Sequence, residues 1–330
     1  MNVESVLPRD AIPSIDDPAF GVEYRGDPDD EVIVVDADPP RAYPIRILSY
    51  HEIVNDVLVE DGSANRSTGA DGAGDVLNGR AIAVTWCPVC WSGVVYDRTV
   101  DGRRLTFGVS GMLADDALVM YDRETGSSWK QTTGVAIDGE LSGTCLPVLP
   151  SPMVSWERFT LDHPDGVVLQ PVRGRASGTD GAALSSYDME PYERYVEREA
   201  FGRYGMRGDG EPRRWEHDDL DAKTPVLGIE HEGDAVAYPV PIVEAAGGAI
   251  QDTVGGREVV VFATTDGIHA FENPGFVFER SDDQVIADGT AWDGVTGESH
   301  DGRRLERVPG RRLFAFAWND AHGHEAFFTD

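Results

Sequence analysis

Short apolar runs bounded by turn residues recur along most of the chain, a pattern typical of buried strands. Asp101-Gly102 separates two β-branched runs and is a strong hairpin signal. Residues 81–131 are therefore expected to form an antiparallel meander. The runs that predict extended segments are residues 32–35, 42–48, 81–86, 94–98, 104–109 and 117–122.

Two short helices are predicted among these strands. The first covers about residues 49–58, where Ser49 could cap the helix and Glu52, three residues on, would complete a capping box. The second covers about residues 152–162. Together the patterns predict an α+β fold that is predominantly antiparallel β with short helices.

The second half of the chain repeats motifs of the first half in the same order. These similarities predict two pseudo-equivalent β-rich units that arose by duplication, so residues 32–131 should superpose on residues 226–299. The matching pairs are residues 42–44 with 237–239, 79–84 with 256–261, 95–98 with 277–280, and 122–126 with 293–297.

The expected organisation has four parts: an irregular leader, a first unit, a connecting segment and a degenerate second unit. Composition alone makes the connecting segment a linker. Within the first unit, a small, polar, glycine-rich stretch at residues 62–79 predicts a surface insertion or flexible loop. The four parts are residues 1–30, 31–170, 171–222 and 223–330.

Charge sets the expected environment. The net charge is −31, from 59 acidic and 28 basic residues, and Lys130 and Lys223 are the only lysines. Molar salt shortens the Debye length to about 3 Å and removes most of the resulting self-repulsion, so the composition predicts a halophilic protein. The alternatives are an ordinary acidic protein or one with an acidic binding face. A nucleic-acid partner is not expected, because phosphate binding needs clustered basic residues.

Targeting signals are also absent from the sequence pattern. The N-terminus has no basic start followed by an apolar run, and no stretch approaches about 18 consecutive apolar residues. We therefore expect a cytoplasmic protein without a membrane partner. Its three cysteines should be reduced unless they are catalytic, redox-active or metal-bound.

The chemically distinctive motif is Cys87-Pro88-Val89-Cys90, called the knuckle below, which lies between two predicted strands. The second unit has Thr264-Thr265-Asp266-Gly267 in its place, so any chemistry belongs to the first unit. Two thiolates on a tight turn can bind zinc, copper or iron when further ligands are present. The nearest candidates are His51 and Cys145. The leading hypothesis is a metal-binding protein with Cys87, Cys90 and His51 as ligands.

Two other interpretations of the knuckle remain open. The cysteines can be small buried hydrophobes packed beside Trp86 and Trp91, with His51 a core histidine. The protein would then be a small-molecule or protein-binding module with its pocket between the two units. A thiol oxidoreductase is the third interpretation, although a strand pattern follows the knuckle where a thioredoxin-like site would have a helix.

A second group of polar and aromatic residues could be directed into one pocket by strand alternation. No His–Asp partner is placed beside the serine, so a ligand-binding rim fits this group better than a catalytic triad. Plain turn and strand packing is the alternative. The group is Ser110, Asp122, Trp129 and Gln131.

Two long stretches resemble the domain-of-unknown-function family 3179. They read AYPIRILSYHEIVNDVL and IAVTWCPVCWSGVVYDRTVDGRRLTFGVSGMLADDALVMYDRETGSSWKQ. Residues 191–195 and 223–228 are also similar, and the resemblance covers roughly residues 31–328. It implies no established activity. With the charge, it suggests a haloarchaeal-type member, and it implies ordered packing of residues 171–222 between the two units.

The chain departs from the family pattern at two places. Family members usually carry glycine directly after the second cysteine, whereas Trp91 stands there and Gly93 follows two residues later. A left-handed turn at this position would be strained by a tryptophan. The loop at residues 62–79 also looks longer than is usual for the family.

Overall fold

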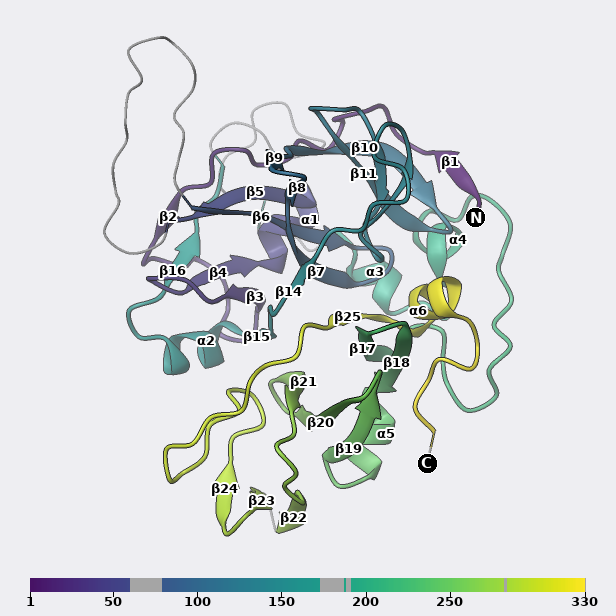
Figure 1. The fold of residues 1–330 in the computed structure, drawn as a ribbon. Helices are drawn as coiled ribbons and strands as arrows, with labels where there is room; N and C mark the ends of the chain where they lie inside the picture. Colours follow the sequence, from purple (N-terminus) through teal and green to yellow (C-terminus); the bar gives the residue numbers. More distant parts are fainter. Residues whose placement is uncertain (60–78, 173–186, 188–190, 282–283, 330) are drawn as a thin grey trace.

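The computed structural model describes residues 1–59, 79–172, 187, 191–281 and 284–329 (Figure 1). Most of the strands in these residues form antiparallel sheets, and the helices are short. The predicted α+β class with predominantly antiparallel β structure is confirmed. Most of the predicted loop at 62–79 and part of the connecting segment lie outside the described residues.

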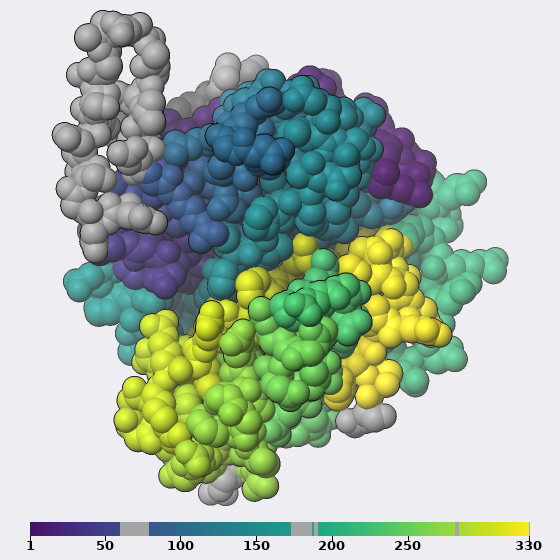
Figure 2. All heavy atoms as spheres, in the orientation of Figure 1, coloured from purple at the N-terminus to yellow at the C-terminus, as the bar shows by residue number. Residues whose placement is uncertain are grey.

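A central sheet joins the two halves of the chain. Its strands lie in the order β18-β17-β25-β7-β6-β5, with β14 paired to β7. Arg312 of β25 pairs with Gly93 of β7, so the predicted first and second units share one sheet. Figure 2 shows the purple-to-teal first half in contact with the green and yellow second half along a broad front. The strands are β5 (Ile53–Leu58), β6 (Arg80–Cys87), β7 (Ser92–Asp97), β14 (Val148–Leu149), β17 (Pro225–His231), β18 (Asp234–Pro239) and β25 (Arg311–Phe314).

The first half contributes two five-stranded sheets and a small hairpin. One sheet contains β1 (Val3–Ser5), β10 (Phe107–Ala114), β11 (Ala117–Asp122), β12 (Ser128–Lys130) and β13 (Val135–Asp138). The other contains β15 (Met153–Ser155), β3 (Glu31–Val35), β4 (Arg41–Pro44), β16 (Val167–Leu169) and β2 (Phe20–Gly21). The predicted Asp101-Gly102 turn is confirmed, because it joins β8 (Thr99–Val100) to β9 (Arg103–Arg104).

The second half adds two three-stranded sheets and two helices. The sheets are β19 (Ala249–Val254), β20 (Arg257–Thr264) and β21 (Gly267–Glu272), then β22 (Glu279–Ser281), β23 (Gln284–Ala287) and β24 (Thr290–Trp292). The helices are α5 (Val240–Ala245) and α6 (Ala315–His322). Across the described parts of the chain, no helix combines the length and apolar composition needed to cross a bilayer.

The first predicted helix was misplaced. Helix α1 covers Ile45–His51, directly after Pro44, whereas residues 53–58 form β5. Ser49 lies inside the helix, and Glu52 ends it in the left-handed conformation with φ of 58°. Ile53, Val54 and Val57 are β-branched and favour a strand, which explains why the helical prediction failed beyond Glu52.

The second predicted helix is confirmed over most of its length. Helix α2 covers Trp156–Asp162, and the residues just before it form β15. The Ser155 hydroxyl accepts a hydrogen bond from the Arg158 N–H at 3.1 Å and thereby caps the helix.

The leader and the connecting segment both pack against the knuckle. The N–H groups of Val6 and Leu7 donate to the Gly111 carbonyl at 2.9 and 3.0 Å, which fixes the leader on β10. The described part of the connecting segment forms α3 (Glu193–Val196) and α4 (Gly202–Arg207). One apolar core cluster holds residues of both halves and of this segment together with the two knuckle cysteines. The knuckle therefore lies where three parts of the chain meet.

Candidate functional site

The knuckle is the turn between two buried strands, as predicted. Cys87 ends β6 and pairs with Ser92 at the start of β7, so Pro88, Val89, Cys90 and Trp91 form the connection. Both cysteines are free thiols and fully buried. Trp91 has φ of 51°, which is the left-handed conformation that favours glycine.

Backbone N–H groups surround the sulfur of Cys87. The Leu118 N–H donates to it at 3.4 Å, and the N–H groups of Val89 and Cys90 also reach it. Burial would raise the pKa of Cys87, but the hydrogen bond from the Cys90 thiol and these N–H donors outweigh burial and hold the pKa below its ordinary value. Cys87 is thus the sulfur that this environment favours as a thiolate.

Cys90 has the opposite character. Its thiol has two acceptors in reach, the Cys87 sulfur and the Asp116 carbonyl oxygen at 3.7 Å. Burial, the hydrogen bond to Cys87 and the negative charges of Cys87 and Asp116 raise its pKa well above the ordinary value, although Lys130 opposes them. The two sulfurs are therefore hydrogen-bonded to each other, with the pKa of Cys87 lowered and the pKa of Cys90 raised.

The β10–β11 hairpin delivers the partners of both sulfurs. Asp115 and Asp116 form its turn, with φ of 47° and 65°, as a type I′ turn requires. This geometry places the Asp116 carbonyl against Cys90 and the Leu118 N–H against Cys87. Lys130 from β12 is buried and donates to the Asp115 carboxylate at 3.0 Å, which supplies a cation behind the turn.

Glu52 supplies a buried carboxyl group beside Cys87. Its N–H donates to the Leu48 carbonyl at 2.7 Å and its carbonyl accepts from the Trp86 N–H at 2.8 Å, so the backbone is fixed between α1 and β6. Burial, followed by the negative charge of Cys87, raises the pKa of Glu52 well above its ordinary value. Glu52 therefore holds its proton more tightly than an exposed glutamate, and its carboxyl lies beside Cys87 in a position to act as a proton donor.

A small cavity of about 70 Å³ lies beside Cys87 and Glu52. The leader covers one side of it, β10 forms another, and the connecting segment closes a third. Two thioethers, of Met112 and Met206, belong to its wall. Its other lining residues are Val6, Leu7, Ile12, Pro88, Val89, Val109, Gly111, Leu113, Leu118, Tyr192 and Arg207.

Two contacts attach the knuckle to the rest of the molecule. The Tyr195 hydroxyl of α3 donates to the Val89 carbonyl at 2.7 Å and accepts from the Gly202 N–H at 3.1 Å. The Phe314 N–H of β25 donates to the Cys90 carbonyl at 2.8 Å. The connecting segment and the second half therefore both hold the backbone of the knuckle.

The predicted third ligand, His51, is bound elsewhere. Its Nδ1 lies 2.8 Å from the Pro13 carbonyl oxygen and its Nε2 lies 2.6 Å from the Tyr187 hydroxyl. Burial lowers the pKa of its imidazole. Helix α1 ends at His51 and the chain turns left-handed at the next residue, so the side chain of Glu52, and not that of His51, reaches the cavity.

A complete metal-ligand set is not present in the described part of the chain. No three or more His, Cys, Asp or Glu side chains gather there in a way that could hold a metal ion. Cys145, the other candidate, is exposed, and its sulfur lies 3.7 Å from the carbonyl oxygens of Thr133 and Leu146. The structure therefore does not join His51 or Cys145 to the two knuckle cysteines.

The predicted pocket rim belongs to the protein core. Ser110 and Asp122 are buried, and Asp122 accepts from the Trp129 Nε1–H at 2.9 Å. Gln131 is fully buried and its Nε2 donates to the Thr85 hydroxyl at 2.9 Å. None of the four residues lines the cavity beside Cys87. Asp122 and Trp129 contact each other, whereas Ser110 and Gln131 bond to other groups in the interior.

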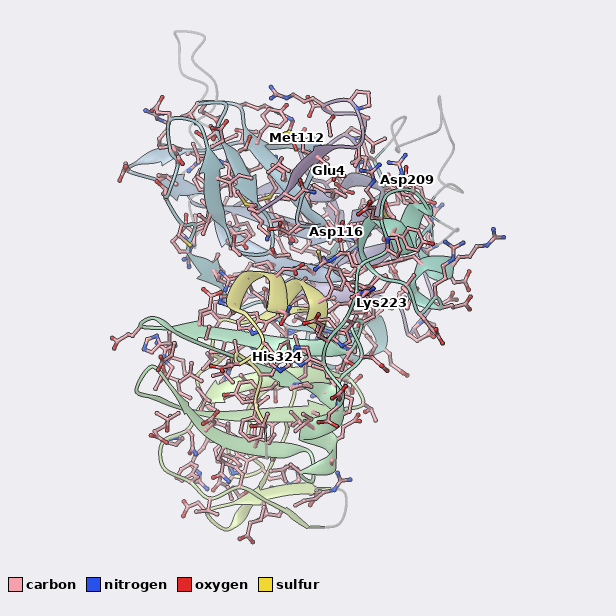
Figure 3. All side chains as sticks on the ribbon, turned by 90° about the vertical axis from the view of Figure 1, so that its right-hand side faces the viewer. Glu4, Met112, Asp116, Asp209, Lys223 and His324 are labelled. Carbon is pink, nitrogen blue, oxygen red and sulfur yellow. The ribbon has the colours of Figure 1, made fainter. Side chains whose placement is uncertain are left out.

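A larger polar cavity of about 550 Å³ lies on the other side of the β10–β11 turn. Glu4, Asp116 and Asp209 lie together on this face of the molecule (Figure 3). Its basic residues are already paired, since Arg213 contacts Asp116 and Asp320 at 3.0 and 2.6 Å. A pocket was expected between the two units. This cavity is lined by residues of both units, of the connecting segment and of the leader.

The residues that give the knuckle its character were not predicted from the sequence pattern. Glu52 was assigned to a helix cap, and Asp116, Leu118 and Tyr195 were not considered as site residues. The Asp115-Asp116 pair between two apolar runs is a turn signal that could have placed the hairpin. The contact of that hairpin with the knuckle is a tertiary one and has no signal in the local pattern.

The chain belongs to the family described as "Protein of unknown function (DUF3179)". The family pattern matches residues 9–64 and 73–326, which is nearly the whole chain. No curated protein and no solved structure matches it. Family membership therefore fixes no activity, and the function has to be inferred from the site.

Proposed function

We propose that this member of the DUF3179 family is a thiol oxidoreductase that cycles Cys87 and Cys90 between a dithiol and a disulfide. One observation carries the proposal: Cys87 is held by backbone N–H donors, is hydrogen-bonded to Cys90, and shares a cavity with the buried acid Glu52. Purely structural cysteines are inert because burial raises their pKa, whereas the pKa of Cys87 is lowered.

The two sulfurs have different roles: Cys87 attacks the substrate and Cys90 resolves the intermediate. The Cys87 thiolate attacks the electrophilic atom of an oxidised substrate, and the bond to the leaving group breaks as that group takes the Glu52 proton. The Cys90 thiol then attacks the Cys87 sulfur, which forms the disulfide, and its proton leaves with the second group. Such pairs need an attacking thiol with a lowered pKa and a resolving thiol within reach.

The N–H donors take the place of the helix in a thioredoxin-like site. The sequence analysis counted the strand after the knuckle against a redox function, because a helix dipole usually lowers the pKa of the attacking thiol. Here the N–H groups of Val89, Cys90 and Leu118 stabilise the Cys87 thiolate without a helix. The strand context is therefore compatible with a reactive thiol.

A chemical oxidation experiment tests the proposal directly. In a Cys145→Ser background, treatment with an excess of glutathione disulfide or of hydrogen peroxide should lower the intact mass by about 2 Da and leave no thiol to alkylate in denaturant. Cys87→Ser and Cys90→Ser, in the same background, should each form no intramolecular disulfide. Cys90→Ser should instead carry the group that Cys87 has captured, as a mixed disulfide with glutathione or as a sulfenic acid. Two free thiols after treatment with both oxidants would show that the cysteines are structural.

A second candidate is capture of a soft metal ion such as Cu(I) by the same two sulfurs. It is favoured by the thioethers of Met112 and Met206 in the wall of the cavity, because thiolate and thioether ligands select Cu(I). Zinc, with four ligands in structural sites, fits this set less well. Protein purified without chelator should then carry about one equivalent of copper, and Cys87→Ser should lose it. Metal-free protein with a full complement of thiols would contradict this candidate.

A further inference from the structure

We propose that the oxidising substrate of the knuckle is a small hydroperoxide, with hydrogen peroxide as the simplest member of the class. This inference rests on the proposed function and names its substrate. It follows from the size of the cavity at Cys87, from the way its walls are fixed, and from the position of Glu52 in it.

The cavity sets an upper limit on the substrate. It offers about 70 Å³, and both knuckle sulfurs are fully buried. A cavity needs about 10–15 Å³ of this kind to hold one water, so this one holds a few water-sized molecules and has room for hydrogen peroxide. Sites for larger organic ligands usually need about 300–1,000 Å³, so a peptide disulfide does not fit beside Cys87.

The walls are fixed by hydrogen bonds, which keeps the cavity small. The Val6 and Leu7 N–H groups both donate to the Gly111 carbonyl. Gly111 has φ of 75°, and a Cβ atom there would lie 2.2 Å from the Leu7 carbonyl oxygen, so only glycine allows this close approach. On the opposite side, Arg207 donates to the Val6 carbonyl at 3.3 Å and ties α4 to the leader.

The groups around the cavity supply the protons and electrons that reduction of a hydroperoxide requires. The Cys87 thiolate attacks one peroxide oxygen, the O–O bond breaks, and the leaving hydroxide takes the proton of Glu52, which gives water, a Cys87 sulfenic acid and a Glu52 carboxylate. The Cys90 thiol then attacks the Cys87 sulfur, and its proton leaves with the sulfenic hydroxyl as a second water. The two sulfurs lose two electrons in total, which reduce the peroxide oxygens.

Stopped-flow oxidation of the full chain in the Cys145→Ser background tests this inference. Hydrogen peroxide should form the disulfide at least about tenfold faster than either cumene hydroperoxide or glutathione disulfide at equal concentration, because only the small oxidant enters the cavity. Glu52→Gln should slow the peroxide reaction about 100-fold or more, since it removes the proton donor for the leaving hydroxide. The intact mass should show loss of about 2 Da without oxygen added to the methionines.

Matched variants separate cavity size from stability. Leu7→Ala and Met206→Ala enlarge the cavity and should raise the ratio of the cumene hydroperoxide rate to the hydrogen peroxide rate. Leu161→Ala, at an exposed position of α2, is the control and should change neither rate.

The outcomes distinguish the two levels of the account. Glutathione disulfide reacting as fast as hydrogen peroxide would overturn the substrate class and leave the redox pair intact. Failure of every oxidant to form the disulfide would overturn the proposed function itself. Oxidation of Met112 or Met206 with both thiols still free would likewise overturn the hydroperoxide reaction at Cys87.

Discussion

The protonation of Glu52 depends on its neighbour Cys87 as well as on burial. The negative charge of Cys87 adds to burial in raising the pKa of Glu52, so the carboxyl keeps its proton where an exposed glutamate would lose it. A buried acid with a raised pKa lowers the free energy of unfolding at any pH above its pKa in the unfolded chain, because the unfolded chain can then release the proton. The same feature that makes Glu52 a proton donor therefore leaves a signature in the stability of the fold.

Glu52→Gln should make the protein more stable near neutral pH. The folded state binds the Glu52 proton more tightly than the unfolded state, so the free energy of unfolding falls as pH rises above the unfolded pKa of about 4.3. Glutamine does not titrate, so the Glu52→Gln variant does not show this fall in the free energy of unfolding. The stability difference between the variant and the parent should therefore grow from about pH 5 towards about pH 8 in urea titrations.

The exposed Glu140 provides the matched control, because its carboxyl lies on the surface with a side-chain exposure of 61%. Glu140→Gln should show a difference from the parent that does not grow with pH. A Glu52→Gln difference that shrinks as pH rises would mean that Glu52 is ionised in the folded protein, and the role of proton donor would be lost.

Trp91 combines a strained backbone with a packed side chain. Its ring lies against Trp86 and Phe314, with centroids 5.0 and 5.9 Å away, while its φ of 51° costs about 1–2 kcal/mol for a residue with a Cβ atom. Both Trp91→Ala and Trp91→Gly should be less stable than the parent because they lose the ring. The free energy of unfolding in urea should nevertheless be about 1 kcal/mol higher for Trp91→Gly than for Trp91→Ala, because glycine relieves the backbone strain.

The same pair of substitutions at Leu161, an exposed position inside α2, should give the opposite order. The free energy of unfolding should be about 1 kcal/mol higher for Leu161→Ala than for Leu161→Gly, because glycine destabilises a helix relative to alanine. Equal stability of the two Trp91 variants would show that the left-handed turn after the knuckle is absent in solution.

At the scale of elements, the sequence predicts strands better than the boundaries between strand and helix. The runs at residues 81–86, 94–98 and 117–122 are all strands, because each is apolar, β-branched and bounded by turn residues. The helix around Ser49 was placed too late, because a plausible cap outweighed the β-branched residues after Glu52. The knuckle between two strands was predictable, whereas the contacts of Glu52, Leu118 and Tyr195 with it depend on pairings distant in sequence.

The duplication stays a prediction, and the structure offers three parallels that support it. The Tyr43 hydroxyl donates to Asp56 in the first half, as the Tyr238 hydroxyl donates to Asp252 in the second. Strands β5, β6 and β7 pair in chain order, as do β19, β20 and β21. Both halves contain an Asp-x-x-Thr-Gly turn in which the aspartate side chain accepts a hydrogen bond from the threonine N–H. The pairs are Asp122 with Thr125 and Asp293 with Thr296.

An experimentally determined structure tests the duplication. Superposing residues 32–131 on residues 226–299 should place Tyr43 over Tyr238 and Asp122 over Asp293, because both pairs hold equivalent turns or strand ends. A superposition that aligns the strands only after their order is changed would contradict common ancestry of the two units.

At the scale of the whole molecule, charge is distributed unequally between surface and site. The net charge is −31, and the chain has only two lysines. Lys130 is buried behind the β10–β11 turn, and the Lys223 amino group lies 4.7 Å from the centroid of the Tyr195 ring and donates to the Tyr195 carbonyl at 2.6 Å. Both lysines therefore support elements that contact the knuckle, while arginines make up the rest of the basic residues.

The excess negative charge predicts a strong dependence of stability on salt. Raising KCl from about 0.1 M to about 2 M should raise the melting temperature, because the repulsion among surface carboxylates is screened. Thermal melts followed by circular dichroism measure the effect, and sodium chloride at matched ionic strength separates screening from specific potassium binding. A melting temperature that does not change with KCl would contradict the halophilic interpretation.

The central claim is that Cys87 and Cys90 form one redox couple, and a redox titration tests it most directly. The Cys145→Ser protein is equilibrated in a series of dithiothreitol buffers of defined potential, alkylated in denaturant and weighed. The account predicts one two-electron transition, in which the ratio of disulfide to dithiol changes tenfold for every ~30 mV. The account is contradicted if both thiols stay free in the most oxidising buffer and also after treatment with hydrogen peroxide, while the protein remains folded.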